Sequence, residues 1–378
     1  MNLSKTGWNV ISEAVLGIWI LMNWKPGFTS RQSLFIMKGN VMVSLQEKIY
    51  GCLMAGAVGD ALGRATEGMM YWEIREKYGI LDQFVSEGYY GKTERKGQWT
   101  DDTTLGCCLA YQIIRKKGRI TPQDFADVIL DKLDESLFWV NEKLIKMRLR
   151  EGISPWDAGQ GGIGCGCAAM GIAPVGIINA RNPEQAFQDG MCLAMVNSNG
   201  ENRDFGAAFA CAIASALKEN ADLESVIADV DCYGTEIVRR AFTLTMDLAA
   251  KSRDEIEFTE RFYEKLLDYT YPQPKGIWKK DRFFSANGRE YVPVAFALWF
   301  LCRGDMNRAL IAAANFGRDC DSIASLTGQI GGALTGASNL REDWVKEVSE
   351  ANQWYLTGLF QDDKVKNMKV VAELLVEC

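Results

Sequence analysis

The chain has 378 residues, of which 48% are hydrophobic and 24% charged, and its formal net charge is -7. This balance predicts a globular protein with a large apolar core. The acidic net charge lacks the positive field that attracts nucleic acids and anionic membranes, so neither is expected as a partner. The sequence contains no histidine, which excludes Ser-His-Asp and Cys-His catalysis, a histidine general base and histidine-ligated zinc, iron or copper.

The 11 cysteines are odd in number and irregularly spaced, and no Cys-x-x-Cys occurs. This pattern is unlike a disulfide framework or a structural zinc site. We therefore expect reduced thiols, most of them buried, and a cytoplasmic protein.

Residues 1–41 differ from the rest of the chain. Their apolar run AVLGIWILMNW, residues 14–24, resembles the apolar part of a signal peptide only faintly. It is too short to span a bilayer, and it ends in Asn23 and Trp24 in place of a small-residue cleavage site. We interpret residues 1–41 as a poorly ordered extension or as a mis-assigned start, with translation beginning at Met42.

The remainder, residues 42–378, shows helices joined by glycine-rich loops. Many small residues in the helical pattern over 45–63 predict close packing against a neighbour. Thr121 and Asn182 each precede a proline, which is typical of an N-cap and the first residue of a helix. The predicted helices cover 45–63, 121–133, 182–196, 206–220, 235–252, 254–269 and 305–317. Because strand-like alternation is scarce, we predict a single all-α domain over 42–378.

Thr100, Asp101 and Asp102 form the first acidic motif, in the stretch QWTDDTTL. A hydroxyl residue followed by carboxylates is an ordinary helix start that needs no further function. Adjacent carboxylates are also ligands for a hard metal cation. The motif alone leaves both interpretations open.

A second acidic motif, GRDCDSIASLTGQIGGALTGA over 317–337, places Asp319, Asp321 and Ser322 ahead of another helix of small residues. Asp-x-Asp lets alternate side chains aim oxygens at one point, although it can also simply cap a helix. Glu67, shortly after GDALG, is a third carboxylate, with a solvated surface position as the alternative. Together these residues supply only oxygen ligands, which select Mg²⁺, Mn²⁺ or Ca²⁺, and two cations would offset the repulsion among the carboxylates.

Other residues near these motifs have two interpretations each. Arg318 could contact a phosphate, but we favour a surface ion pair. Cys320 has a thiol that is too soft for Mg²⁺, so we expect it to pack inward. Trp99 and Tyr291 could stack on a base, although core packing is the commoner fate of aromatic residues.

The densest glycine segment is DAGQGGIGCGCAAMG, residues 157–171. Glycine lets backbone N–H groups approach a phosphate closely. The segment lacks the order of a P-loop or of a dinucleotide fingerprint. A connection between tightly packed helices is therefore an equally good explanation.

The motifs GAVGDALGRATE, QWTDDTTL, the glycine-rich segment and GRDCDSIASLTGQIGGALTG follow one another in an order that resembles the ADP-ribosylglycohydrolase family, which includes dinitrogenase-reductase-activating glycohydrolase. The resemblance covers about residues 45–340. It implies a compact all-α domain with a dinuclear Mg²⁺ or Mn²⁺ centre in a cleft, and a mobile acidic residue near the metals at Glu67. The implied metal ligands are Thr100, Asp101, Asp102, Asp319, Asp321 and Ser322. The implied loop for the diphosphate and ribose consists of Gly161, Gly162, Ile163 and Gly164.

The chain departs from the family pattern at three places. Ser322 stands where the family usually has threonine, which keeps the hydroxyl group. Gly171 replaces an arginine, and Asn197, Ser198 or Asn199 replaces a histidine on the adenine or ribose side. We therefore expect the metal site to be kept and the distal substrate pocket, with Ser198 as a contact, to differ.

The resemblance implies hydrolysis of an N- or O-glycosidic bond at ribose C1, with an ADP-ribosylated protein or another ADP-ribose conjugate as substrate. Glu67 or Asp102 would act as the general base. Two alternatives stay open: a hydrolase of a smaller riboside or nucleoside-like metabolite, and a binding or structural protein of the same fold without catalysis. The retained carboxylates argue against the last, because clustered carboxylates are costly without a cation.

Overall fold

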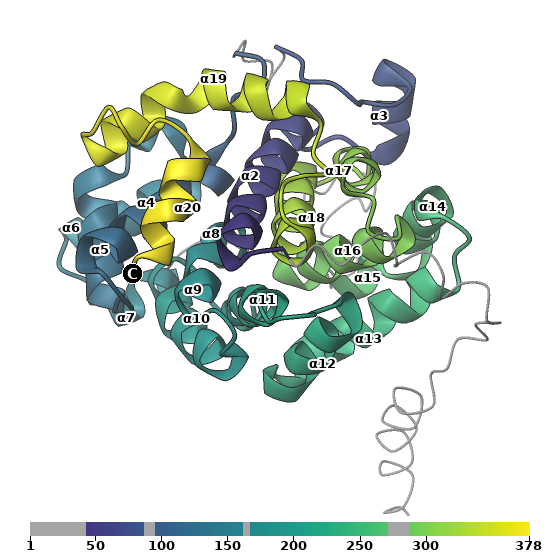
Figure 1. The fold of residues 1–378 in the computed structure, drawn as a ribbon. Coiled ribbons are helices and arrows are strands. Elements are labelled where there is room, and N and C mark those ends of the chain that lie inside the picture. Colours follow the sequence, from purple (N-terminus) through teal and green to yellow (C-terminus); the bar gives the residue numbers. More distant parts are fainter. Residues whose placement is uncertain (1–42, 87–94, 162–166, 271–286) are drawn as a thin grey trace, which may run out of the picture. The chain divides into compact units, whose positions relative to one another are not determined.

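The computed structural model describes residues 43–86, 95–161, 167–270 and 287–378. Throughout these ranges the regular structure is helical, apart from an isolated antiparallel bridge between Met70 and Gly317 (Figure 1). The prediction of an all-α domain is confirmed. Residues 1–41, for which the sequence suggests an extension or a mis-assigned start, lie outside the described residues.

The helices follow one another along the chain with mostly short connections. The first group consists of α2 (Leu45–Gly63), α3 (Tyr71–Tyr78), α4 (Asp101–Lys116), α5 (Pro122–Lys132), η3 (Glu135–Leu137), α6 (Val140–Arg150), α7 (Pro155–Ala158), η4 (Gly159–Gly161), α8 (Cys167–Gly171), α9 (Ala173–Ile178) and α10 (Pro183–Asn197). The second group consists of α11 (Asn202–Ala216), α12 (Leu223–Tyr233), α13 (Glu236–Ala250), α14 (Glu255–Lys265), α15 (Leu267–Thr270), α16 (Gly288–Leu301), α17 (Met306–Ala314), α18 (Cys320–Thr335), α19 (Glu342–Phe360) and α20 (Met368–Val376).

Local sequence signals explain where several helices begin. The Thr121 hydroxyl accepts a hydrogen bond from the Asp124 N–H at 3.2 Å, and the Asp124 carboxylate accepts one from the Thr121 N–H at 2.9 Å. This reciprocal pair is a capping box ahead of α5. Asn182 caps α10 by accepting from the Gln185 N–H at 3.2 Å. The two N-caps predicted from the sequence are therefore confirmed.

Helices α2 and α18 lie side by side, and glycines let their backbones touch (Figure 1). A Cβ atom added to Gly59 would lie 2.1 Å from the Ala324 carbonyl oxygen, and one added to Gly328 would lie 2.0 Å from that of Ala55. Neither position accepts a side chain without a backbone shift. The small residues of 45–63 thus serve close packing, as predicted.

The packing of α2 against α18 sets the place of the acidic motifs. The end of α2 lies against the first turn of α18, because a Cβ atom on Gly63 would be 2.5 Å from the Asp321 Cα. Glu67 follows shortly after α2, and Asp319 directly precedes Cys320, the first residue of α18. Two acidic segments that are far apart in sequence therefore meet at the same end of the helix pair.

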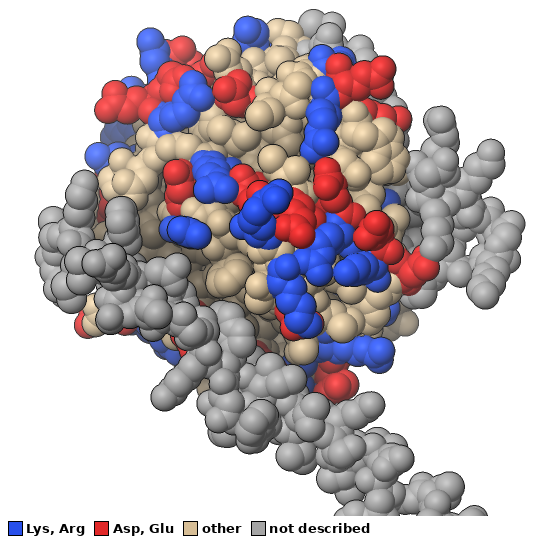
Figure 2. Space-filling view, turned by 90° about the vertical axis from the view of Figure 1, so that its right-hand side faces the viewer, with Lys and Arg blue, Asp and Glu red and all other residues tan. Residues whose placement is uncertain are grey.

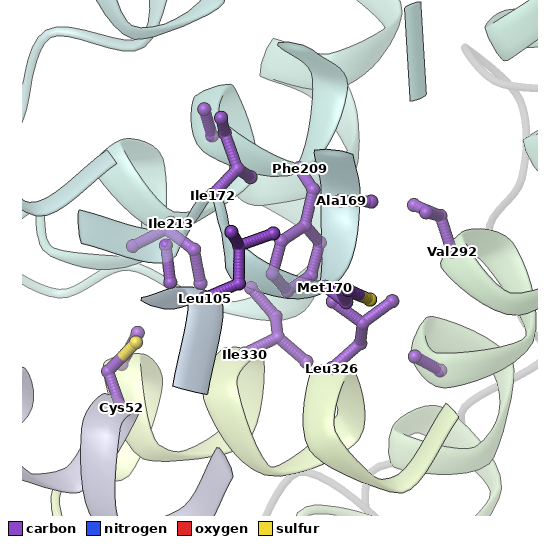
Figure 3. Close-up of a cluster of buried hydrophobic side chains, with 14 of the residues drawn as sticks. Cys52, Leu105, Ala169, Met170, Ile172, Phe209, Ile213, Val292, Leu326 and Ile330 are labelled. Carbon is purple, nitrogen blue, oxygen red and sulfur yellow. The ribbon is translucent and has the colours of Figure 1, made fainter. Parts of the chain in front are cut away.

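A buried apolar cluster joins α4, α8, α11 and α18 (Figure 3). Its members include Leu105 of α4, Met170 of α8, Phe209 of α11, and Leu326 and Ile330 of α18. Burial of each large side chain contributes about 1.5–3 kcal/mol relative to leaving it exposed. Because α8 forms the last five residues of the glycine-rich segment 157–171, this cluster holds the downstream end of that segment in place.

The surface mixes charges of both signs. Figure 2 shows Lys and Arg side chains interspersed with Asp and Glu on the face that it displays. Opposite charges pair at the surface, as Arg308 does with Glu255 at 2.6 Å and Lys251 with Asp247 at 2.5 Å. Over the described ranges, no helix combines the length and the apolar character needed to cross a membrane.

Gly328→Ala should lower the free energy of unfolding by about 1–3 kcal/mol, because the added methyl group meets the Ala55 carbonyl inside the α2–α18 contact. Gly358→Ala is the matched control. Gly358 lies in α19 with nothing near its Cβ position, so alanine should raise the stability by about 0.5–1 kcal/mol. Urea unfolding measures both changes, and equal effects would contradict the backbone contact.

Candidate functional site

Side chains that the sequence singles out meet in one cavity of about 350 Å³. Helices α4 and α18 contribute residues from their beginnings, and the connection after α2 contributes Glu67. The predicted metal and catalytic residues that line this cavity are Glu67, Thr100, Asp101, Asp102, Asp319, Asp321 and Ser322.

The first acidic motif begins a helix and also faces the cavity. Thr100 is the N-cap of α4, and its hydroxyl accepts a hydrogen bond from the Asp102 N–H at 3.3 Å. The helix-start interpretation is therefore correct, and it does not exclude the other. The Asp101 carboxylate accepts from the Trp139 N–H at 3.2 Å, whereas Asp102 Oδ1 is buried and has no hydrogen-bond partner.

Asp60, on α2, is a fully buried carboxylate that sequence reasoning did not identify. It accepts hydrogen bonds from the Thr100 N–H at 2.9 Å, from the Thr103 N–H at 3.0 Å and from the Thr103 hydroxyl at 2.5 Å. These bonds fasten the first turn of α4 to α2. The available signal was an aspartate within a helix of small and apolar residues, since a buried charge needs dedicated partners.

In the second acidic motif, Asp319 and Asp321 face the cavity, whereas Cys320 between them faces the protein interior. Asp319, at the N-cap position of α18, makes no side-chain capping bond, and Asp321 accepts from the Ser322 N–H at 3.0 Å. Both carboxylates line the cavity. Cys320 lies between them and is fully buried, with its Sγ 3.1 Å from Thr66 Oγ1. The prediction that the thiol packs inward is confirmed.

Glu67, Asp319 and Asp321 form an acidic group that could hold a metal ion. One carboxylate oxygen from each residue lies within 4.8 Å of the other two. Oxygen ligands of this kind suit hard cations such as Mg²⁺, Mn²⁺ or Ca²⁺. The sequence indicated a catalytic role for Glu67, and the structure places it among candidate ligands as well.

The carboxylates of the cavity lie in an unfavourable electrostatic environment. Burial, followed by repulsion from Asp321, raises the pKa of Asp60 to about 7. The same two causes raise the pKa values of Glu67, Asp102 and Asp319 well above their usual range. Carboxylates buried at this density are stable only when they are protonated or neutralised by cations. The donor set therefore fits a metal centre.

Arg318 forms a buried ion pair with Glu290 of α16, so the expected surface ion pair is wrong. Its Nε and Nη2 donate to the two Glu290 oxygens at 2.7 and 3.1 Å, and the two side chains are 1% and 0% exposed. The Arg318 N–H donates to the Met69 carbonyl at 2.6 Å, and the Arg318 carbonyl accepts from the Gly68 N–H at 2.7 Å. The pair lies inside because α16 and the connection that carries Glu67 enclose it.

The predicted phosphate-binding segment is described only in part. Gly162, Ile163 and Gly164 lie outside the described residues, whereas Gly161 ends η4. A Cβ atom added to Gly161 would lie 2.2 Å from the Arg148 guanidinium. The absence of a side chain at this position lets the Arg148 guanidinium lie against the backbone, and a larger residue would require that guanidinium to move.

Ser198 is 1% exposed and is not among the described residues that line the cavity. Its hydroxyl accepts a hydrogen bond from the Ala168 N–H at 3.0 Å, near the start of α8. Helix α8 in turn places Cys167 and Met170 in the cavity wall. The contact seen for Ser198 is structural, and its substrate contact stays a prediction.

The cavity also has walls that sequence reasoning missed. They consist of Phe138, Trp139, Val140 and Lys143 at and before the start of α6, and of Asn352, Trp354 and Tyr355 on α19. Trp99 and Tyr291, considered for stacking, line the cavity too but are only 6% and 1% exposed. No sequence motif marks these walls, because an apolar helical residue follows the same periodicity whether it faces a core or a cavity.

A protein-family model described as ADP-ribosylglycohydrolase matches residues 42–373. The chain belongs to the ADP-ribosylglycohydrolase family. Members of this family are hydrolases that act on glycosidic linkages and are generally metal-dependent, so the prediction of an enzyme of this class is confirmed.

Relatives and a solved structure agree with this membership. The uncharacterized protein YegU of Escherichia coli (strain K12) is 28% identical over 327 residues, which cover 81% of this chain and 93% of that protein. The ADP-ribosylarginine hydrolase Tri1 of Serratia proteamaculans (strain 568) is 23% identical over 85% of this chain and 78% of its own length. A chain solved as an "ADP-ribosylglycohydrolase-related protein complex" superimposes with a TM-score of 0.63 at 19% identity, covering 88% of this chain and 97% of that one. The last likeness shows a shared fold.

Glu290→Gln should lower the free energy of unfolding by about 3–5 kcal/mol, because the buried Arg318 guanidinium loses its counter-charge. Asp247→Asn is the control, since the Asp247–Lys251 pair is exposed and its loss should cost less than about 0.5 kcal/mol. Urea denaturation of the two variants measures the difference. Losses of similar size would show that burial of the first pair does not matter.

Without divalent cations, the protein should lose thermal stability as the pH rises from about 5 to about 7.5. Burial raises the pKa of Asp60 from 3.8 to about 7 and also raises the pKa values of Glu67 and Asp102, so the folded protein binds more protons than the unfolded chain in this interval. The stability that these protons contribute is lost as the pH climbs through the folded-state pKa values.

Added Mg²⁺ should raise the melting temperature, and more so at the upper pH, because metal ligands must be deprotonated. Calorimetric melting in EDTA and in MgCl₂ measures both effects, with NaCl at equal ionic strength as the control. A melting temperature that increases with pH in EDTA would be the opposite of this expectation.

Proposed function

We propose that the protein hydrolyses an N- or O-glycosidic bond at C1 of a ribose, with an ADP-ribosylated protein or another ADP-ribose conjugate as substrate. The observation that carries the proposal is a single cavity in which five carboxylates converge with hydroxyl groups: Glu67, Asp101, Asp102, Asp319 and Asp321 with Thr100 and Ser322. This set of acidic and hydroxyl oxygen donors suits a sugar that is bound through cations. Family membership supports the same class of reaction.

The proposed cofactor is a pair of Mg²⁺ or Mn²⁺ ions. The residues that would hold them are Thr100, Asp101 and Asp102 on one side and Asp319, Asp321 and Ser322 on the other. When bound, the cations would supply positive charge that holds the 2- and 3-hydroxyls of the ribose. Two observations support the fit. Asp102 Oδ1 is a buried hydrogen-bond acceptor without a partner, and carboxylate oxygens of Glu67, Asp319 and Asp321 lie close enough together to bind one metal ion.

The carboxylates of the chain supply the proton transfer. A water molecule attacks C1 while the bond from C1 to the leaving nitrogen or oxygen breaks, and the sugar ring passes through an oxocarbenium-like transition state. Glu67 or Asp102 takes a proton from the attacking water and returns one to the leaving atom. The other carboxylates stabilise the positive charge that develops on the ring.

The carboxylates named above form the acidic floor of the cavity. The residues proposed to bind the diphosphate and its ribose beyond this floor are Ser198 and the segment Gly161, Gly162, Ile163 and Gly164. The Arg148 guanidinium lies against Gly161 and adds positive charge beside this segment. Its Nε donates to the Ala158 carbonyl at 2.9 Å, which holds the arginine in place. The Ser198 hydroxyl holds the chain at Ala168, just past the segment.

The relative named ADP-ribosylarginine hydrolase favours an arginine-linked conjugate. A smaller riboside or nucleoside-like metabolite is the second candidate, because a cavity of about 350 Å³ is near the lower end of ligand pockets and Ser198 is not in its described lining. A binding or structural protein without catalysis is the least favoured, because the full set of carboxylates is kept.

Glu67→Gln should reduce the release of ADP-ribose from an ADP-ribosyl-arginine protein by about 100-fold or more, because the amide cannot accept a proton. Glu76→Gln is the control, since Glu76 is an exposed glutamate on α3. Release is measured with Mg²⁺, with Mn²⁺ and after EDTA treatment, and Mg²⁺ affinity is measured by titration calorimetry. Retained affinity with lost turnover assigns the base to Glu67, whereas unchanged turnover removes Glu67 from the mechanism.

A further inference from the structure

An aromatic wall runs along one side of the cavity. Trp99 precedes the N-cap Thr100, and its ring meets that of Tyr355 edge-on, with 6.1 Å between centroids. Tyr355 meets Trp354 in the same way at 5.9 Å. Trp99 and Tyr355 are 6% and 8% exposed, whereas Trp354 is 48% exposed. The wall therefore begins beside the acidic floor and ends in an indole ring that is open to solvent.

Trp354 stands on a helix that is held firmly against the site. Asn352, also on α19, donates from Nδ2 to the Gly97 carbonyl at 2.8 Å, and its Oδ1 accepts from the Trp99 N–H at 3.3 Å. The Tyr355 hydroxyl donates to a backbone carbonyl of α4 at 3.3 Å. The indole is thus presented at a defined distance from the first turn of α4.

Core packing does not account for Trp354, because about half of its surface is exposed. Exposed aromatic side chains that line a cavity are typical of binding surfaces. Val140, at the start of α6, lines the same cavity and is also 48% exposed. These two side chains give the cavity exposed apolar surface, next to the exposed side chain of Lys143 and in contrast to the carboxylates around Glu67.

We infer that Trp354 binds the leaving group of the substrate and favours a planar, electron-delocalised group that is joined to ribose C1 through nitrogen. This inference rests on the proposed function, which places the ribose among the carboxylates. A guanidinium group and a heteroaromatic base both offer a planar face that stacks on indole. The oxygen and tetrahedral carbon of an O-linked serine offer none.

In this proposal, different helices carry the residues that bind the leaving group and those that bind the diphosphate. Helix α19, which carries Trp354, packs on α2 and α4. Helix α8, which forms the end of the glycine-rich segment, packs on α11 and α4. Of the residues proposed to hold the diphosphate, the structure describes Gly161 and Ser198, and neither lines the cavity with Trp354. A change at Trp354 is therefore expected to act on the leaving group rather than on these two residues.

The experiment compares Trp354→Ala, Trp354→Phe and Gln353→Ala in the full chain with Mg²⁺. Gln353 is the control, because it is the exposed neighbour of Trp354 on α19. The substrates are an ADP-ribosyl-arginine peptide, nicotinamide riboside and an ADP-ribosyl-serine peptide. Trp354→Ala should lower kcat/KM about tenfold for substrates with planar leaving groups and less than about twofold for the serine-linked peptide, while Trp354→Phe keeps most of the activity. Comparing the arginine-linked peptide with nicotinamide riboside shows whether Trp354 favours a guanidinium or a heteroaromatic base as the leaving group.

Titration with ADP-ribose, which has no leaving group, separates a local effect from a structural one. Its affinity should be the same in wild type and in all three variants. An equal loss of kcat/KM on all substrates, no loss on any, or turnover confined to the serine-linked peptide overturns the inference. If the wild type hydrolyses none of them, the proposed function fails. Calorimetric binding of the ADP-ribosyl-arginine peptide then decides the inference, which stands if Trp354→Ala weakens that binding relative to ADP-ribose and falls if it does not.

Discussion

Direct backbone contact between α2 and α18 is the constraint on which the site depends. Glycines such as Gly59 and Gly328 let the two helices approach until a carbonyl of one lies where a Cβ atom of the other would be. This contact brings the end of α2 to the beginning of α18, and Asp60 of α2 then fastens the first turn of α4 to the same place. The acidic motifs converge because three helix ends converge.

The cavity that results is a compromise between stability and chemistry. Its carboxylates repel one another in a buried place, which raises their pKa values and makes a cation their natural partner. Hydrogen bonds and an ion pair next to the cavity hold these carboxylates in place despite their repulsion. The Arg318–Glu290 pair and the backbone bonds of Arg318 to Gly68 and Met69 hold the connection that carries Glu67 beside α18. Charges that repel are thereby kept within reach of one ligand.

The helical fold and the acidic floor could be predicted from the sequence, whereas much of the cavity's wall could not. Periodicity and N-caps such as Thr121 act over a few residues, so they are visible locally. Thr100 caps α4 and also lines the cavity, so the helix-start interpretation of its motif is confirmed and the metal-ligand interpretation stays a prediction. Asp60 and Trp354 were missed because nothing near them in the sequence indicates what lies opposite. Arg318 was misplaced for the same reason.

By itself the sequence determined the class of chemistry. In this chain without histidine, the Thr, Asp and Ser side chains of the Thr-Asp-Asp and Asp-x-Asp-Ser motifs offer a cation oxygen ligands, and this preference for a hard cation follows from residue type alone. The tertiary structure decided which carboxylates share the site, that Glu67 stands with Asp319 and Asp321, and that an aromatic wall from α19 adjoins them. These segments would lie roughly hundreds of ångströms apart in a fully extended chain. Only the packing of the helices sets the distances between them in the folded protein.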